Sequence, residues 1–123
     1  MQLIFINRKV FNALADEARE VYVRDQVTRE VDEYNEEVQG TNIGYVERGD
    51  VDNIVRGIIS LIVKNENIIR KYSWKGYLEE LYPASEQTSG FSYTTGKYAV
   101  SAFDWSAENE DELEYSFNVL RVL

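Results

Sequence analysis

Cysteine and histidine are both missing from this sequence of 123 residues, and their absence removes whole classes of chemistry. A chain without cysteine forms no disulfide, thiolate metal site or thiol nucleophile. A chain without histidine lacks the commonest general base and the commonest metal ligand. We therefore expect no catalytic residues, no bound metal and no cofactor. Catalysis by paired carboxylates, as in glycosidases, is the one enzymatic alternative that the composition leaves open.

Proline and long apolar runs are also scarce. The only proline is Pro83, and the most apolar stretch, residues 54–63, is interrupted by Arg56 and Ser60. This stretch is far shorter than the roughly 20 residues that cross a bilayer. The apolar start of the chain, residues 1–6, precedes the first basic residues, which reverses the order found in a signal peptide. We therefore expect a cytoplasmic protein that contacts no membrane.

Positive charge is in short supply as well. The formal net charge is −9, from 22 acidic and 13 basic residues. Such a charge repels DNA, RNA and anionic lipid surfaces, which proteins bind through clustered Lys and Arg. It favours a basic protein partner, although solubility alone is a simpler reason for an acidic composition. With 44% hydrophobic residues the chain has material for a core, and its length predicts a single domain over residues 1–123.

The N-terminal third predicts a strand followed by helix. Residues 3–6 are a short apolar run, typical of a buried strand. From Val10 onward, apolar spacings of three and four predict helix up to Gly40. Two stripes carry this helical pattern, namely Phe11, Leu14, Ala18 and Val21, and then Val27, Val31, Tyr34 and Val38. The stripes are out of phase at residues 23–26, so either one helix bends there or two helices meet.

The middle of the chain carries the widest apolar stripe. We expect a short strand within residues 41–47 and then a central core helix that Asp50 caps. Gly57 weakens this helix by about 1 kcal/mol relative to alanine, so it indicates a close crossing of two helices. A further short helix is expected at residues 73–82, before Pro83. The central stripe consists of Val51, Ile54, Val55, Ile58, Ile59 and Ile62.

The C-terminal third predicts strands. Aromatic and β-branched residues at 91–103 flank Gly96 and Lys97, which predicts a hairpin with its turn at that pair. Apolar and polar residues alternate over 113–120, and we favour a strand there. A helix with Ser106 as its cap remains the alternative. The elements together predict an α+β fold, in which a small, mostly antiparallel sheet of the N-terminal strand, the hairpin and the last strand packs on three to four helices.

Tyr93 and Lys97 have the spacing of a known catalytic pair. In this respect they resemble the Tyr-xxx-Lys pair of short-chain dehydrogenases. That family also has a Gly-rich phosphate turn after its first strand, which this sequence lacks. It holds the pair on a helix, whereas Gly96 favours a turn. We therefore assign the pair no catalytic role.

Arginine and tyrosine together suggest a ligand site. Guanidinium groups bind phosphates and aromatic rings stack on bases, so a small-molecule binder that sequesters a nucleotide signal is an alternative function. One domain of this size offers little depth, which would place such a pocket at a homodimer interface. Surface ion pairs compete with this interpretation, since Arg29 has Asp25 and Glu33 four residues away on either side. The candidate ligand-binding residues are Arg24, Arg29, Arg56 and Arg70.

Acidic residues gather in two segments of the chain, which also contains nine tyrosines. Tyrosine suits protein interfaces because it offers contact area and a hydrogen bond at low entropic cost. The segment at 108–112 does not fit an EF-hand calcium loop, which requires glycine at its sixth position and an acid at its twelfth. The candidate partner-binding residues are Asp32, Glu33, Tyr34, Glu36 and Glu37, together with Glu108, Glu110, Asp111 and Glu112.

The leading functional prediction is a non-enzymatic, acidic binding protein that occupies a basic, nucleic-acid-binding surface of a partner. In general character the chain is similar to small phage or mobile-element proteins that inhibit host defence systems, so counter-defence is the expected role. Direct binding of DNA or RNA is not expected, because the charge has the wrong sign. The nucleotide binder described above is the first alternative. A virion or plasmid assembly component, oligomeric through exposed tyrosines, is the second.

Overall fold

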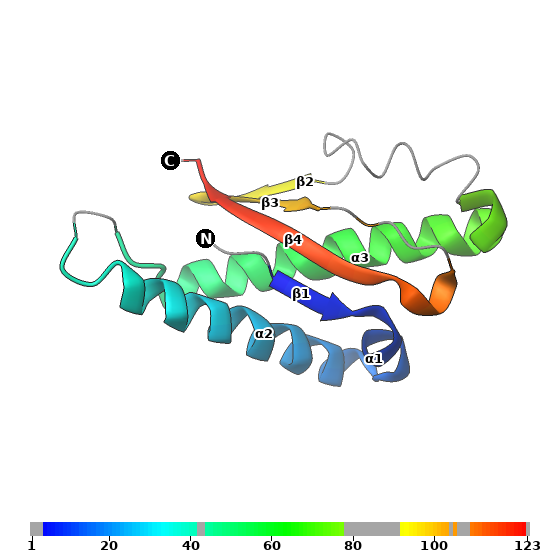
Figure 1. Cartoon of the computed structure of the whole chain (residues 1–123), viewed down its shortest axis with the longest axis horizontal. Coiled ribbons are helices and arrows are strands. Elements are labelled where there is room, and N and C mark those ends of the chain that lie inside the picture. The colour runs from blue at the N-terminus through cyan, green and yellow to red at the C-terminus, as the bar shows by residue number, and fades with distance from the viewer. Residues whose placement is uncertain (1–3, 42–43, 78–91, 104, 106–108, 123) are drawn as a thin grey trace.

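The computed structural model describes residues 4–41, 44–77, 92–103, 105 and 109–122 of the chain. It confirms the α+β fold, with three helices and one four-stranded antiparallel sheet (Figure 1). In chain order the elements are β1 (Ile4–Asn7), α1 (Arg8–Ala13), α2 (Asp16–Glu37), α3 (Arg48–Gly76), β2 (Ser92–Thr95), β3 (Tyr98–Ala102), the 3₁₀ turn η3 (Glu110–Glu112) and β4 (Glu114–Arg121). Among the described residues, no helix combines the length and the apolar character needed to cross a bilayer.

The sheet has the strand order β1-β4-β3-β2. Strands β2 and β3 form the expected hairpin, in which Thr95 pairs with Tyr98 and Gly96 adopts a φ of 55°. Two-residue hairpin turns commonly require positive φ values, which glycine adopts without steric cost. Strand β4 lies between β3 and β1 and pairs Phe117 with Ile4, so the last segment is a strand rather than a helix.

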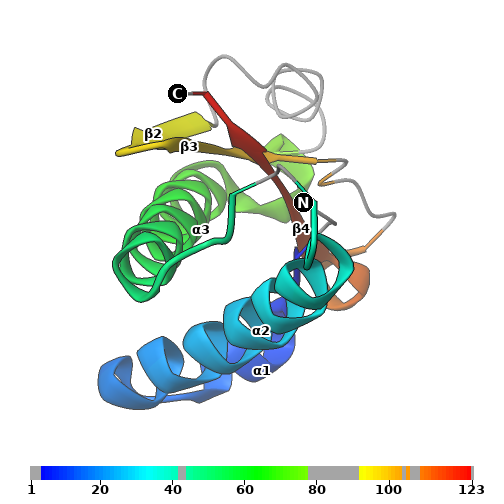
Figure 2. The ribbon, with the colours of Figure 1, turned by 90° about the vertical axis from the view of Figure 1, so that its left-hand side faces the viewer.

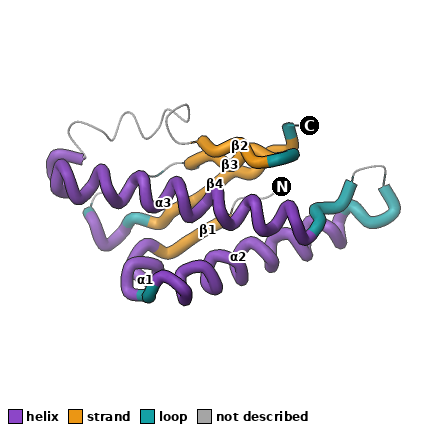
Figure 3. Tube along the Cα trace, turned by 180° about the vertical axis from the view of Figure 1, so that it is seen from behind, coloured by secondary structure: helices purple, strands orange, loops and turns teal. Residues whose placement is uncertain are grey.

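Helices α2 and α3 cover the same face of the sheet. Figure 2 shows both helices on one side of the strands, and Figure 3 shows α3 lying across them. Between the two layers, Trp105 packs edge-on against Tyr115 and Phe117, with ring centroids 4.8 and 5.1 Å apart. The Trp105 indole N–H donates to the Ser116 carbonyl at 2.7 Å, so this fully buried side chain has its polar atom satisfied.

The first helical region breaks earlier than the sequence predicts. The break falls at Leu14 and Ala15, which are both extended. Helix α2 then runs without interruption through residues 23–26, so the expected bend or junction there is wrong. The apparent phase change arose because Val21, a member of the first stripe, is in fact 60% exposed. The stripe that α2 buries consists of Val23, Val27 and Val31.

Helix α3 is longer at both ends than expected. Its N-cap is Glu47, whose backbone N–H donates to Asp50 Oδ2 at 3.0 Å, so Asp50 acts from inside the first turn. The further helix that we expected begins at a break in α3, where Ser73 has a φ of 61°, and helical structure continues to Gly76. The remainder of that expected helix, residues 78–82, lies outside the described residues.

The connection between α2 and α3 contains no strand among its described residues, 38–41 and 44–47, contrary to our expectation of a strand within 41–47. Residues 42–43 lie outside the described part. A side chain takes the place of a neighbouring strand: Asn35 of α2 accepts from the Val46 N–H at 2.9 Å and donates to the Val46 carbonyl at 3.1 Å. Both backbone groups of Val46 are thereby satisfied without sheet pairing.

Gly57 marks a close approach of α3 to the sheet, and not the helix crossing that we expected. A Cβ atom at this position would lie 3.0 Å from Cδ1 of Tyr93 on β2 and 3.4 Å from Cγ2 of Val100 on β3. Both neighbours belong to the hairpin, and Gly57 itself is buried. The glycine therefore sets how closely the helical layer packs on β2 and β3.

We expect Gly57→Val to lower the free energy of unfolding by about 1–3 kcal/mol, the usual cost of overpacking a core. Urea denaturation monitored by circular dichroism measures this change. The matched control is Gly49→Val in the first turn of the same helix, where an added Cβ meets nothing within 4 Å. Equal effects of the two substitutions would contradict the close approach as the reason for glycine at position 57.

Candidate functional site

The second half of α2 carries a dense group of carboxylates. No basic residue follows Arg29 in this helix, and four of the five acidic side chains beyond it are exposed. The buried valines of α2 occupy the opposite side of the helix. We call the five acidic residues the acidic face of α2; they are Glu30, Asp32, Glu33, Glu36 and Glu37.

The carboxylates of the acidic face lie close enough to repel one another. Partial burial raises the pKa of Glu30, and the charges of Glu33 and Glu37 raise this pKa further, while Arg29 partly opposes the shift. These three glutamates are three and four residues apart, a spacing that places them as neighbours on one side of the helix. Arg29 alone therefore does not neutralise the negative charge here.

The other expected partner-binding residues lie elsewhere. Tyr34 is half-buried and packs against the core, so it does not accompany the carboxylates on the surface. The exposed acids Glu110, Asp111 and Glu112 form η3, and Glu108 lies outside the described residues. Figure 1 shows the C-terminal end of α2 and η3 at opposite ends of the molecule. The two acidic segments therefore do not form one surface.

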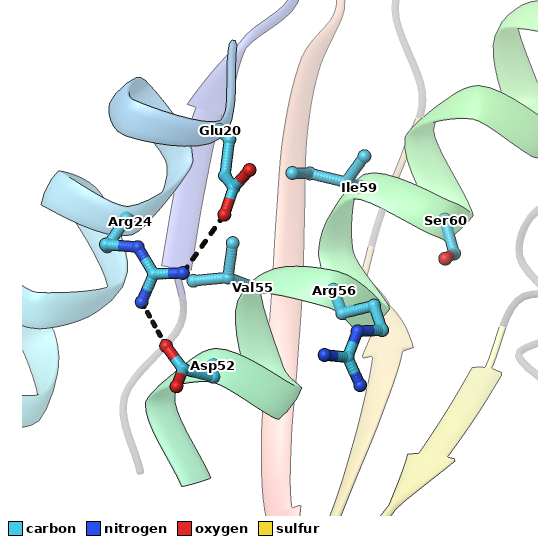
Figure 4. Close-up of a pocket in the computed structure, with 7 residues that line it drawn as sticks. All are labelled: Glu20, Arg24, Asp52, Val55, Arg56, Ile59 and Ser60. Atoms are coloured by element: carbon cyan, nitrogen blue, oxygen red, sulfur yellow. Dashed lines mark hydrogen bonds and ion pairs between the residues drawn. The ribbon is translucent and has the colours of Figure 1, made fainter. Parts of the chain in front are cut away.

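Two of the four candidate arginines converge. Arg24 of α2 and Arg56 of α3 line a groove of about 340 Å³ between these helices, which has Val55 and Ile59 among its lining residues (Figure 4). Arg70 lines cavities near the other end of α3, and Arg29 lies beside the acidic face. The four arginines therefore do not build one phosphate site within a single copy of the chain.

The guanidinium of Arg24 is already occupied. It donates to Asp52 of α3 and, at 3.2 Å, to Glu20 of its own helix, and these hydrogen bonds raise the pKa of Arg24 (Figure 4). Arg56 differs, because its one hydrogen bond to a described residue is a long one of 3.5 Å to Asn53 Oδ1. In the groove, the guanidinium of Arg24 is thus neutralised by carboxylates, whereas that of Arg56 forms no ion pair with a described carboxylate.

A network of ion pairs and hydrogen bonds connects α1, α3, η3 and β4. The sequence did not indicate this network. Arg8, at the start of α1, donates through Nε and Nη2 to both oxygens of Glu66 in α3, at 2.6 and 3.0 Å. The same guanidinium donates to the carbonyl and the carboxylate of Glu110, each at 3.2 Å. The hydroxyl of Tyr115 on β4 also donates to Glu66, and Asn65 donates to that hydroxyl at 3.1 Å.

The network depends on a carboxylate that is largely removed from water. The side chains of Arg8 and Glu66 are only 11% and 15% exposed. Burial alone would raise the pKa of Glu66, but the hydrogen bonds from Arg8 and Tyr115 and the charge of Arg8 outweigh it and hold this pKa below its usual range. Burial and the Glu66 carboxylate raise the pKa of Tyr115, which keeps its proton. The arrangement is a structural clamp, since Arg8, Glu66 and Tyr115 hold one another through hydrogen bonds and opposite charge.

No metal centre forms on the described part of the chain, where no group of three acidic side chains could hold an ion. Tyr93 and Lys97, the pair with dehydrogenase-like spacing, also have separate surroundings. Tyr93 lies over Gly57, and the Lys97 ammonium is 3.9 Å from Glu47. Among the described residues, exposed charge is a prominent chemical feature of the surface.

We expect Arg8→Met to lower the free energy of unfolding by about 3 kcal/mol, because it leaves the Glu66 carboxylate buried without a cation. The dependence on pH should change sign as well. In the wild type, the lowered pKa of Glu66 stabilises the fold above about pH 4.3, the ordinary value for glutamate, and this stabilisation is lost as the pH falls through the folded-state pKa. In the variant, only the hydrogen bonds from Tyr115 and Asn12 still oppose burial, so we expect this pKa to rise above its usual value. The Glu66 contribution should then make the variant more stable as the pH falls through it.

Urea denaturation at a series of pH values between neutral and acidic measures both effects. The control is the double variant Arg8→Met, Glu66→Leu, which replaces the pair by apolar side chains and should recover most of the lost stability. A single variant with the same pH dependence as the wild type would show that Arg8 does not control the protonation of Glu66.

Comparisons with known proteins transfer no function to this chain. It matches no protein-family model, no curated protein and no solved structure at a significant level. Its role has therefore to be inferred from the charges, contacts and exposed surfaces described above.

Proposed function

We propose that this protein is a non-enzymatic binding protein that occupies a basic surface of a protein partner through the acidic face of α2. The observation that carries the proposal is the acidic face itself, with four exposed carboxylates and no basic residue after Arg29 in α2. Burial is the first cause of the raised pKa of Glu30, and the neighbouring charges of Glu33 and Glu37 add to it. Like charges at these spacings destabilise a helix by about 0.2–0.5 kcal/mol per pair. A partner that supplies Lys and Arg side chains would relieve this repulsion on binding.

The density of charge on the acidic face favours a partner that normally binds nucleic acid. Residues 30–37 span about 10 Å of helix axis at 1.5 Å per residue. Their five carboxylates therefore follow one another about every 2.5 Å along the axis. Duplex DNA carries one negative charge per roughly 1.7 Å of its axis. A protein surface adapted to phosphates would meet a similar charge density on α2.

The proposed mechanism is competition for that surface. Exposed charges attract a basic partner over about a Debye length, roughly 8 Å at physiological salt, and so raise the rate of encounter. Once bound, the acidic face prevents nucleic acid from reaching the same Lys and Arg residues. This mechanism supports the finer proposal of a counter-defence inhibitor, comparable to the small phage or mobile-element proteins that inhibit host defence systems.

We expect the triple variant Glu33→Lys, Glu36→Lys, Glu37→Lys to weaken binding of a basic partner at least tenfold. Isothermal titration with an arginine-rich peptide measures this affinity, and the wild-type affinity should fall as salt is added. The variant removes attraction and adds repulsion at the proposed contact, while its side chains remain exposed and need no repacking.

The matched control reverses three exposed acids at the opposite end, in the variant Asp111→Lys, Glu112→Lys, Glu114→Lys. Three reversals bring the net charge of −9 to −3 in both variants. The control should therefore retain most of the affinity if the acidic face is the contact. Equal losses in the two variants would mean that only net charge matters, and a greater loss in the control would move the contact to η3.

A second candidate function is favoured by Arg56, which no described carboxylate pairs. Its guanidinium and the Ser60 hydroxyl line the groove between α2 and α3, beside an apolar patch of Val55 and Ile59. Phosphate and an aromatic base are the chemical groups that such a lining would bind. This is the nucleotide binder of the sequence-based alternative, with the site now proposed at the groove.

We expect a nucleotide bound in this groove at 100 times its dissociation constant to stabilise the protein by about 2.7 kcal/mol. Thermal denaturation with a panel of adenine and cyclic nucleotides measures this shift. Arg56→Gln should abolish it, whereas Arg29→Gln, on an exposed part of α2, should preserve it. Absence of a shift with every nucleotide in the panel would reject this second candidate.

A further inference from the structure

The sheet has an outer face that no described element covers. Helices α2 and α3 occupy the other side, as Figure 2 shows. Alternation along the strands turns Ile4 and Ile6 of β1 toward the helices, where both are fully buried, and leaves Phe5 on the outer face with 48% of its surface exposed. By the same alternation, Leu120 of β4 and Phe103 after β3 are outward and are 52% and 48% exposed.

The centre of this face is built from small, uncharged side chains. The register places Ser101 opposite Asn118 and Ala99 opposite Leu120, while Phe5 lies opposite Ser116. Strand β2 extends the face with Ser92 and Thr94, which pair with Ser101 and Ala99. The middle of the outer face therefore carries small side chains, with the aromatic rings of Phe5 and Phe103 toward one end and Leu120 toward the other.

Charge is almost absent from the outer face, although 28% of the whole chain is charged. Among the outward positions of the described strands, only Glu114 at the start of β4 carries a charge. Solvated sheet faces are ordinarily polar, and exposed edges and faces are commonly protected by charged side chains. Depletion of charge together with exposed aromatic and aliphatic residues is instead the composition found at the centre of protein interfaces.

We propose that the outer face of the sheet is the interface of a homodimer, in which two copies stack their sheets face to face. Antiparallel sheets pack in this way about 10 Å apart, and small central side chains allow the close approach. A twofold axis joins the same patch of both copies. Neither copy is then left with an exposed patch that could bind a further copy.

The distribution of charge favours a second copy of this chain as the partner that covers the outer face. Two chains of net charge −9 repel each other, and contact through the helical layer would bring their acidic faces together. Face-to-face stacking of the sheets puts both helical layers on the outside, so it keeps the acidic faces of the two copies far apart. A basic protein or a nucleic acid finds no complementary charge on this face, whereas a second neutral face of the same shape matches it.

The mass of the protein in solution tests the proposal. We expect the wild type to have twice the chain mass of 14.3 kDa by light scattering, and Leu120→Lys to have the mass of a single chain. The matched control is Val21→Lys on α2, where the replaced valine is 60% exposed and lies away from the sheet. This control should remain dimeric.

Cross-linking provides a second test that does not depend on the folding of Leu120→Lys. The chain has no cysteine, so Ser101→Cys introduces a unique thiol in the middle of the outer face. Oxidation with diamide should join two copies of this variant through a disulfide, and Val21→Cys should remain uncross-linked. A monomeric wild type would overturn the proposal. A dimer that persists in Leu120→Lys and does not cross-link through position 101 would also overturn it, because its interface would lie elsewhere.

Discussion

The apolar face of α3 is the contact that organises both layers of the fold. Helix α2 packs on one side of it and strands β2, β3 and β4 on the other, so α3 touches more elements than any other part of the described chain. Burial of its aliphatic side chains contributes about 25 cal/mol for each square ångström removed from water. Gly57 fixes the separation of the layers where the hairpin crosses α3, and the clamp from Arg8 to Glu66 fixes the position of β1 and α1 near the far end of α3.

Much of the fold was predictable because its signals are local. The stripe of α3 repeats with the helical period, the pair Gly96 and Lys97 lies between β-forming residues, and residues 113–120 alternate with the period of a strand. The acidic face was accessible for the same reason, since a helix converts nearby sequence positions into neighbouring surface positions. What failed was the position of the first helix break, because Val21 has the character of a core residue and yet lies in solvent.

The remaining features depend on contacts between distant parts of the chain. No pattern in the sequence joins Arg8, Glu66 and Tyr115, which come from α1, α3 and β4 and meet only because the sheet places their elements together. The partner of Gly57 was missed for a related reason: a glycine in a helix indicates a close neighbour but does not say whether it is a helix or a sheet. The acidic face of α2 and the neutral outer face of the sheet can likewise be recognised as two separate surfaces only once the arrangement of the layers is known.

The pairing of β1 with β4 has a consequence for how the chain folds. Ile4 pairs with Phe117, so β1, the first described strand, has its sheet partner in β4, the last described strand. The helices and the hairpin can form from local contacts, whereas pairing of β1 with β4 must close a loop that contains all the other described elements, and such non-local contacts form slowly. Until then, one edge of β4 and the apolar side chains of β1 have no sheet partner. Closure of this loop is therefore expected to be slow, and until it occurs the unpaired edge of β4 is available for pairing with other chains.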